Sequence, residues 1–353
     1  MKIVLTGGGT AGSVTPLLAI LEELRSRESS VECLFVGTRR GEPEKRMIDP
    51  YNVTWSTITS GKLRRYWSPV NFIAPFAVVI GFFQALVLFA RFRPDCIVSA
   101  GGYVGVPCVW AGWVLGIRIV LHQPDLRPGL ATMLTYRFAH EITTGFLETS
   151  NRFPGKTARW TGVPVRKSLT KPILSVPTLN LPLEKPFVLI LGGGTGSMTL
   201  NNLALEVFQI INSQMNLLLV SGKGKQPMAS HGGLIIRENL TADEMNYALS
   251  HATVIVSRAG ANAIFEAASV QKPLILVPLP HSPQIANTDF MVHEDAALHF
   301  EPSTGNAEKL CRMISSLETD PHLRARIIKN AYKFVRPDAA RNLANIIFSL
   351  AQR

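Results

Sequence analysis

The sequence predicts an α/β protein with two doubly wound domains, each built on a parallel β-sheet. Two observations predict this class. Short, fully apolar segments that end at small residues alternate with segments of helical periodicity, which is typical of parallel sheets covered on both faces. One strand–glycine loop–helix pattern also occurs twice, as KIVLTGGGTAGSVTPLLAILEEL from residue 2 and as FVLILGGGTGSMTLNNLALEVFQII from residue 187. Two domains explain this repetition better than one large sheet.

The expected strands are apolar runs that end near a glycine, a proline or another small residue. In chain order they lie at 2–6 (KIVLT), 31–37 (VECLFVG), 95–101 (DCIVSAG), 118–123 (RIVLHQ), 187–191 (FVLIL), 253–257 (TVIVS) and 273–277 (PLILV). The alternation of strands and helices is interrupted near TGVPVRKSLTKP at 161–172, so we place the domains at 1–163 and 164–336. A helix with one apolar stripe restarts after Pro337.

Composition narrows the class of protein further. The chain has 353 residues, of which 46% are hydrophobic and 17% charged, so it can bury a sizeable core. Its net charge of +11 favours an anionic partner, such as a phosphate-bearing ligand, an anionic membrane surface or nucleic acid; a role in solubility alone is the alternative. The four cysteines include no Cys-x-x-Cys pair, and we expect them to be reduced in a cytosolic protein. The start, MKIVLTGGG, lacks the long apolar core of a secretory signal.

Residues 70–90 form an apolar run in which only Asn71 and Gln84 are polar. The run is long enough to span a bilayer, but a spanning helix would put the loops at Gly7 and Gly101 of one sheet on opposite sides of the membrane. Two alternatives remain. One is a buried crossover helix kinked at Pro75. The other is an apolar patch in a membrane interface, flanked by basic residues at Lys62, Arg64, Arg65, Arg91 and Arg93.

The first glycine loop fits the dinucleotide pattern Gly-x-Gly-x-x-Gly at residues 7–12. A nicotinamide site would also need an acidic residue at the end of the second strand, where the sequence gives Gly37, Thr38, Arg39 and Arg40. Thr15 and Pro16 suit the cap and first turn of the following helix, so a phosphate near the loop remains reasonable. The alternative is a tight packing turn with no ligand.

A third strand–loop–helix unit carries more polar side chains. Arg258 directly follows a buried strand, Asn262 begins a helix, and Glu266 lies four residues later on the same helix face. A guanidinium and a carboxylate around a turn can bind phosphate and sugar hydroxyls, or can simply support the helix. Gln284 and Asn287 follow the next strand, where their amides could meet hydroxyl groups.

Five motifs follow one another along nearly the whole chain: TGGGTAGSVTP, SAGGYVGVP, HQPDLRPGL, LGGGTGSMTLNN and SRAGANAIFEAASVQKPLILVPLPHSPQIAN. In order and spacing they resemble the MurG family, whose members transfer N-acetylglucosamine to lipid I, the undecaprenyl-diphosphate-linked muramyl peptide. The resemblance implies a GT-B fold, with two Rossmann-like domains facing across a cleft and a last helix, 337–353, packing back on the first domain. It implies an inverting transfer in peptidoglycan synthesis, and so a part in cell shape and division, with release of UDP and no cofactor.

The resemblance assigns the donor, UDP-N-acetylglucosamine, mainly to the second domain. Glu266 matches the ribose ligand, and the other implied donor residues there are Gly194, Thr195, Ala242, Arg258, Ala261, Asn262, Ala263, Ile264, Phe265, Gln284 and Asn287. Arg166 matches a position beside the uracil, as Ala242 does. In the first domain the implied donor residues are Thr10, Ala11, Gly12 and Asp125, and the residues on the acceptor side are Gly9, Ser13, Tyr103 and, from the second domain, Asn201.

The same resemblance implies the location and the partners. The protein would bind peripherally to the cytoplasmic face of the plasma membrane. Residues 70–90 would contact the anionic membrane surface, and the protein would there reach its undecaprenyl-diphosphate-linked acceptor. Envelope-synthesis proteins are further candidate partners, and no nucleic acid is expected. The sequence contains no Asp-x-Asp pair, so we expect no protein-bound metal ion.

Two departures from the family pattern bear on catalysis. Ser13 stands where the family has a histidine, and His122-Gln123-Pro124-Asp125 stands where the family has His-Glu-Gln-Asn, so the acid has moved from the second to the fourth position. The candidate bases are His122, by its intrinsic pKa, and Asp125; a structural histidine and an Asp125–Arg127 ion pair are the alternatives. Ser13 cannot serve as a base unaided, and we place Glu266 in the catalytic set.

Three other functions stay open at this point. The chain could use the same donor on another lipid-linked acceptor. It could be a catalytically inactive homologue that scaffolds an envelope-building complex. It could also be an NADP-dependent oxidoreductase, for which Arg39 and Arg40 would bind the 2′-phosphate.

Overall fold

The computed structural model describes residues 1–9, 11–39, 41, 44–61, 70–171, 173–176, 178–179, 181, 184–194, 196–227 and 232–352. The chain divides into two compact units. The first unit comprises Met1–Arg166 and Arg336–Arg353, and the second comprises Lys167–Val335. Each unit is built on its own parallel sheet, which confirms the predicted α/β class.

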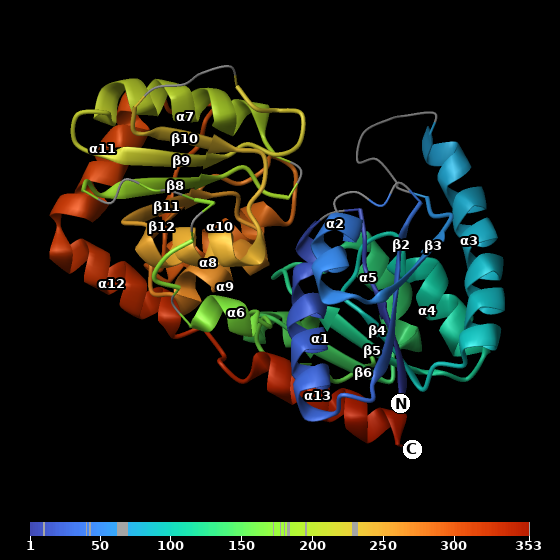
Figure 1. Cartoon of the computed structure of the whole chain (residues 1–353). Coiled ribbons are helices and arrows are strands. Elements are labelled where there is room, and N and C mark those ends of the chain that lie inside the picture. The colour runs from blue at the N-terminus through green and yellow to red at the C-terminus, as the bar shows by residue number, and fades with distance from the viewer. Residues whose placement is uncertain are drawn as a thin grey trace. The chain divides into compact units, whose positions relative to one another are not determined.

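The first unit contains a seven-stranded parallel sheet in the order β3-β2-β1-β4-β5-β6-β7 (Figure 1). The strands are β1 (Lys2–Thr6), β2 (Glu32–Thr38), β3 (Thr54–Ile58), β4 (Cys96–Ser99), β5 (Arg118–Gln123), β6 (Glu141–Thr144) and β7 (Ala158–Trp160). The side chains of the inner strands are mostly buried on both faces, as continuous apolar runs such as KIVLT predict, whereas the edge strands β3 and β7 are only partly buried. The chain order reverses between β1 and β4, and ligands of open α/β sheets bind at such a switch point.

Helices cover both faces of this sheet. α1 (Thr15–Arg27) and α13 (Ala339–Ala351) pack against each other on one face, where Leu343 and Ile347 share a core with Leu17 and Ile20. On the other face lie α3 (Val70–Phe92) and α4 (Gly105–Val114). The shorter helices α2 (Glu44–Ile48) and α5 (Leu130–Thr135) lie near the carboxyl ends of the strands.

The C-terminal segment contacts the rest of the first unit through the stacked side chains of Arg336 and Trp160. The guanidinium of Arg336 lies 3.7 Å from the ring centroid of Trp160, and the indole N–H of Trp160 donates to the carbonyl of Gly145. Gly162 has a φ of +83°, and a Cβ atom there would lie 2.5 Å from the Arg336 side chain. A glycine is therefore required where the two segments cross.

The second unit contains a six-stranded parallel sheet in the order β10-β9-β8-β11-β12-β13. Its strands are β8 (Phe187–Leu191), β9 (Asn216–Val220), β10 (Leu234–Arg237), β11 (Val254–Ser257), β12 (Leu274–Leu276) and β13 (Leu298–His299). The helices are α6 (Lys167–Thr170), α7 (Met198–Ile211), α8 (Ala242–His251), α9 (Ala261–Ser269), α10 (Gln284–His293), α11 (Ala307–Thr319) and α12 (Pro321–Tyr332). The switch point of this sheet lies between β8 and β11.

The burial of α3 excludes one of the two alternatives for residues 70–90, the wholly buried crossover helix. A wholly buried helix would hide its apolar side chains, but α3 buries one face, including Ala85 and Phe89, and exposes the other. The exposed side chains recur at helical spacing and are more than half exposed: Phe72, Ile73, Phe76, Val79, Ile80, Phe83 and Val87. Gln84 accepts a hydrogen bond from the Thr59 N–H at 2.7 Å and ties the helix to the chain after β3.

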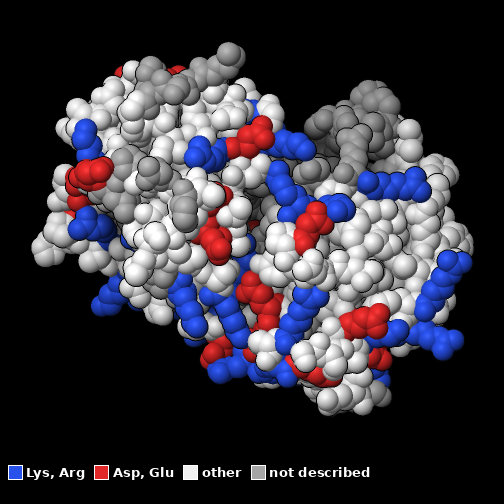
Figure 2. Space-filling model, in the orientation of Figure 1, with Lys and Arg blue, Asp and Glu red and all other residues white. Residues whose placement is uncertain are grey.

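Two further observations concern this helix. Among the described residues, one helix, Asn71–Phe92, has the length and apolar character needed to cross a membrane. In Figure 2 the flank of the first unit that carries α3 is mostly uncharged, with a few lysine and arginine side chains, and more charged side chains lie over the rest of the visible face. Arg91 and Arg93 are exposed at the end of the helix, whereas Lys62, Arg64 and Arg65 lie outside the described residues.

Candidate functional site

The carboxyl edge of the first sheet brings together two glycine loops, which follow β1 and β4 at the switch point. A Cβ atom on Gly102 would lie 2.4 Å from the carbonyl oxygen of Gly8, so the two loops touch backbone to backbone. Gly9 has a φ of +88°, and the ring of Tyr103 covers it so closely that a Cβ atom would lie 2.0 Å from a ring carbon. The structure therefore brings Gly9 and Tyr103 together, and their place on the acceptor side stays a prediction.

Glu44 is a residue of this edge that the sequence did not indicate. It is fully buried at the start of α2, where its carboxylate accepts hydrogen bonds from the backbone N–H of Gly9 and from the hydroxyl of Thr38 at 3.1 Å. A buried carboxylate that occupies the Gly9 N–H would repel a phosphate at the same position. The Gly9 N–H is thus already bound within the protein, whereas the amides of a dinucleotide loop face the pyrophosphate.

Ser13 lies in the turn Ala11–Ser13, between β1 and α1. Its side chain is buried, and its hydroxyl would lie 3.2 Å from a Cβ atom on Gly102, so Ser13 packs directly on the loop after β4. The helix begins one residue earlier than predicted, because Val14 is its N-cap and the Thr15 hydroxyl donates to the carbonyl of Ala11 instead of capping the helix. Ala11 and Gly12 are at least partly exposed, and Thr10 lies outside the described residues.

His122 lies inside the first unit and not at an open surface. Its ring is fully buried, Nδ1 is 3.0 Å from the hydroxyl of Thr143, and Nε2 has no hydrogen-bond partner among the described residues. Burial lowers the pKa of His122 to about 3, because the charged imidazolium is poorly solvated there. A ring that is shielded from solvent and resists protonation does not suit a general base, so the structure favours the structural alternative for His122.

Asp125 follows β5 at the same edge as the glycine loops and is half-buried. Of the two candidate bases, it is the one whose side chain is partly accessible. The geometry of the first unit therefore leaves Asp125 as the better candidate for accepting a proton.

The second glycine loop follows β8 in the second unit. Gly193 has a φ of +83°, and both Gly193 and Gly194 are exposed, so the backbone of this loop is open to a ligand; Thr195 lies outside the described residues. Ser197 caps α7, accepting from the Leu200 N–H at 3.3 Å. An open, glycine-rich turn ahead of a capped helix is suited to a phosphate group.

Arg258 stabilises this loop through hydrogen bonds. Its guanidinium donates to the carbonyls of Val277 (3.0 Å) and Pro278 (3.2 Å), which follow β12, and to the hydroxyl of Ser197. Burial lowers the pKa of Arg258 from its usual range, and the guanidinium remains charged because that range is so high. The arginine therefore places a positive charge beside the second glycine loop while fixing its shape.

Several predicted donor residues gather at the same edge of the second unit. Ala261, Asn262, Ala263, Ile264, Phe265 and Glu266 form the first turns of α9, directly after Arg258. The Asn287 side chain donates to the carbonyl of Ala259 at 2.9 Å, and the Gln284 side chain accepts from the Leu279 N–H at 2.9 Å. Ala242 is the first residue of α8, behind a capping box formed by Thr241 and Glu244.

Two further predicted site residues are Asn201 and Arg166. Asn201 is fully buried in the second unit, and its amide nitrogen donates to the carbonyls of Ser221 and Lys225, both at 3.0 Å. It shapes the loop after β9, and its assignment to the acceptor side stays a prediction. Arg166 is the last residue of the first unit's N-terminal stretch, and its side chain hydrogen bonds to Tyr51; its place beside the uracil stays a prediction.

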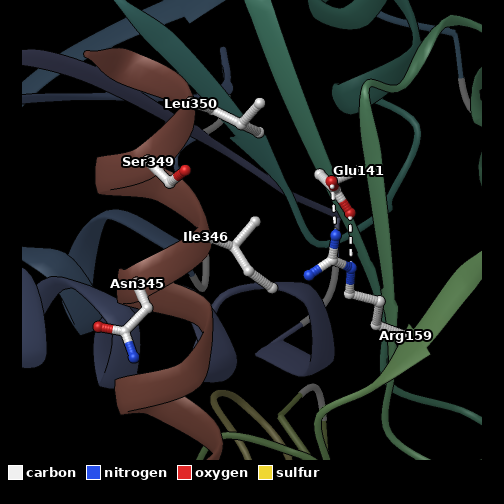
Figure 3. A pocket seen from close by; sticks show the side chains of 6 residues that line it. All are labelled: Glu141, Arg159, Asn345, Ile346, Ser349 and Leu350. Carbon is white, nitrogen blue, oxygen red and sulfur yellow. Dashed lines mark hydrogen bonds and ion pairs between the residues drawn. The ribbon is translucent and has the colours of Figure 1, made fainter. Parts of the chain in front are cut away.

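A pocket of about 290 Å³ lies at the other edge of the first sheet (Figure 3). Its lining includes an ion pair, in which the Arg159 guanidinium contacts the Glu141 carboxylate at 3.1 and 3.2 Å. The other lining residues lie on α13 and are Asn345, Ile346, Ser349 and Leu350. Glu141 is the first residue of β6, so the pocket opens at the amino ends of the strands and not beside the glycine loops. Within the described ranges, no group of three or more His, Cys, Asp or Glu side chains could hold a metal ion.

Comparison with known proteins matches both units. Residues 3–144 match the glycosyltransferase family 28 N-terminal domain, and residues 187–343 match the glycosyltransferase family 28 C-terminal domain. Proteins named UDP-N-acetylglucosamine--N-acetylmuramyl-(pentapeptide) pyrophosphoryl-undecaprenol N-acetylglucosamine transferase are similar along the chain. The one from Lachnospira eligens is 33% identical over 98% of each chain, and the one from Clostridium kluyveri is 36% identical over 79% of each.

Solved structures agree on the fold. The crystal structure of Acinetobacter baumannii MurG covers 99% of both chains with a TM-score of 0.72 at 22% identity. A UDP-GlcNAc 2-epimerase from Neisseria meningitidis, bound to UDP-GlcNAc, has a TM-score of 0.71 at 13% identity and covers 99% of this chain and 100% of its own. These likenesses confirm the predicted GT-B class of two Rossmann-like units. From the two matched domains and the relatives that are at least 30% identical over most of its length, the chain belongs to the MurG family of N-acetylglucosamine transferases.

Proposed function

We propose that this chain transfers N-acetylglucosamine from UDP-N-acetylglucosamine to the muramyl sugar of undecaprenyl-diphosphate-linked lipid I, with inversion and with release of UDP. One observation carries the proposal: the chain is 33% identical over 98% of its length to a relative named for this reaction. The glycine loops at both switch points support it, because each stands where an open α/β sheet binds its ligand.

The second unit would bind the donor. The exposed backbone of Gly193 and Gly194 and the positive charge of Arg258 suit the diphosphate of a nucleotide sugar, and they would stabilise the negative charge that develops on departing UDP. The carboxylate of Glu266 would bind the ribose hydroxyls. No redox cofactor is needed for this group transfer.

The first unit would bind the acceptor at the edge that carries Gly9, Ser13 and Tyr103. Asp125 would take the proton of the attacking sugar hydroxyl as the new glycosidic bond forms and the bond between the sugar and the diphosphate breaks. The proton thus moves from the acceptor hydroxyl to the Asp125 carboxylate, and the electron pair of the broken bond leaves with UDP.

The exposed face of α3 would hold the protein peripherally on the cytoplasmic side of the plasma membrane. Its phenylalanine and isoleucine side chains offer an apolar surface, and exposed Arg91 and Arg93 offer charge to anionic lipid headgroups. A peripheral enzyme of this kind could reach an acceptor whose lipid tail stays in the bilayer.

A different lipid-linked acceptor is the second candidate, and Ser13 favours it, because it stands where the resemblance to the family implies a histidine on the acceptor side. UDP release, measured with lipid I and with other polyprenyl-diphosphate-linked sugars, separates the two. Turnover with lipid I supports the first proposal, turnover with another acceptor alone supports the second, and no UDP release with any acceptor would point to a scaffold. UDP-N-acetylglucosamine, and not NADPH, is expected to raise the melting temperature.

A further inference from the structure

Gln123 is the last residue of β5, and its side chain is almost completely buried. The amide nitrogen donates to the carbonyl of Asp125 at 2.9 Å and to the carbonyl of Arg127 at 3.4 Å. The amide oxygen accepts from the hydroxyl of Thr132, on α5, at 2.7 Å. Both amide hydrogens and the amide oxygen are therefore used within the protein.

The loop between β5 and α5 is held at three successive carbonyls. Gln123 binds the carbonyls of Asp125 and Arg127, and the buried hydroxyl of Thr149 donates to the carbonyl of Leu126 at 2.9 Å. Because every one of these contacts is to a carbonyl, each requires a hydrogen-bond donor at the side chain. An ionised carboxylate at position 123 has no hydrogen to donate and would repel both carbonyl oxygens.

We propose that Gln123 is a positioning residue for Asp125, and that the amide at position 123 and the acid at position 125 act as a pair. The inference rests on the proposed function, in which Asp125 accepts the proton of the acceptor hydroxyl. Gln123 fixes the backbone at Asp125 and so holds the carboxylate at the carboxyl end of β5. The family's acid at the second position of this segment is here an amide, because in this chain that position serves to hold the loop.

The test replaces the amide in two ways and measures kcat with lipid I at saturating UDP-N-acetylglucosamine. Gln123→Met keeps the approximate volume and removes all three bonds, and we expect kcat to fall by roughly tenfold to a hundredfold through misplacement of Asp125. Gln123→Glu should lose as much at pH 8. Its burial beside carbonyl oxygens raises the pKa of the new carboxyl, and the protonated acid regains one donor. The ratio of its kcat to that of the wild type should therefore rise as the pH falls from 8 to 6, whereas the ratio for Gln123→Met should stay flat.

Two further variants separate positioning from simple loss of structure. Thr132→Val removes only the donor to the Gln123 oxygen and should lower kcat in the same direction by a smaller factor. Thr135→Val is the matched control, since Thr135 is buried on the same helix but its hydroxyl, within the described part of the chain, donates only to the backbone carbonyls of Ala131 and Thr132. We expect it to leave kcat unchanged.

A double-mutant cycle gives the sharpest readout. If Gln123 acts through Asp125, then Gln123→Met should cost little in a chain that already carries Asp125→Asn. Full additivity, a Gln123→Glu ratio that does not change with pH, or a wild-type kcat for Gln123→Met would overturn the proposal. If the wild type itself transfers no sugar, the proposed function fails and the role of Asp125 fails with it. Wild-type transfer with unaffected Gln123 variants would refute the positioning role alone.

Discussion

The exposed face of α3 makes a quantitative prediction about membrane binding. Phe76 and Phe83 are 71% and 60% exposed, which leaves roughly 130 Å² of each side chain available, given about 200 Å² for a whole phenylalanine. At about 25 cal/mol per Å², complete insertion of both rings is worth about 6 kcal/mol, and insertion to the depth of the headgroup boundary about half of that. Replacing both by serine should therefore weaken binding to anionic vesicles roughly a hundredfold.

Cosedimentation with vesicles that contain anionic lipid, at low and at moderate salt, measures this change. Phe82 stays in place because it packs partly against the core, so its loss would confuse binding with stability. The matched control is Ile210→Ser with Val292→Ser, two substitutions of part-exposed apolar residues on α7 and α10 of the second unit. Binding of the Phe76→Ser, Phe83→Ser protein as tight as that of the wild type would refute the reasoning. So would a wild type that binds no vesicles at any salt concentration.

The remaining predictions concern three side chains of the two units. For His122 the folded pKa of about 3 lies below the usual 6.5, so the unfolded chain binds the proton first and stability is lost as the pH falls from about 6.5 toward 3. His122→Leu should flatten the loss, by up to about 1.4 kcal/mol per pH unit in denaturant titrations, and an unchanged slope would contradict the burial argument. Asp125→Asn should lower kcat about a hundredfold or more while His122→Leu lowers it far less, as turnover assays at saturating donor can check; the reverse order would restore His122 as the base. Glu266→Ala should raise the Kd for UDP-N-acetylglucosamine in calorimetry, and an unchanged Kd would remove Glu266 from the donor site.

The strands that the sequence predicted have continuous apolar runs, as β1 and β8 do, although β9 (NLLLV) and β10 (LIIR) have such runs too and were not predicted. β6 (Glu141–Thr144) and β7 (Ala158–Trp160) were not predicted, because EITT and ARW show neither an apolar run nor a clear alternation. Thr143 and Thr144 are buried nonetheless, since their hydroxyls are satisfied by His122 and by Ser150 at 3.0 Å. Local patterns do not show that a polar side chain will find its partner on another strand.

The candidate site could be predicted from the sequence where backbone loops form it, and less so where the role of a side chain depends on its burial. The glycine loops lie at the switch points because their sequences and the strand order fix them there. His122 was a candidate base by its intrinsic pKa, but its burial between strands favours the structural alternative. Glu44 could not be found from sequence, because it comes six residues after Thr38 and reaches back to Gly9 only once α2 has folded. Nearly all residues of α3 are apolar, so the sequence did not show which face of the helix would be buried. Packing against the rest of the first unit determines which face is exposed.

The most direct test of the proposed function is an assay with radiolabelled UDP-N-acetylglucosamine and lipid I in vesicles, followed by identification of the lipid product. We expect the label to move into a lipid that carries the N-acetylglucosamine–muramyl disaccharide, with one UDP released for each sugar transferred. A protein that binds UDP-N-acetylglucosamine but leaves lipid I unlabelled, under conditions in which a family member labels it, would contradict the proposed transfer.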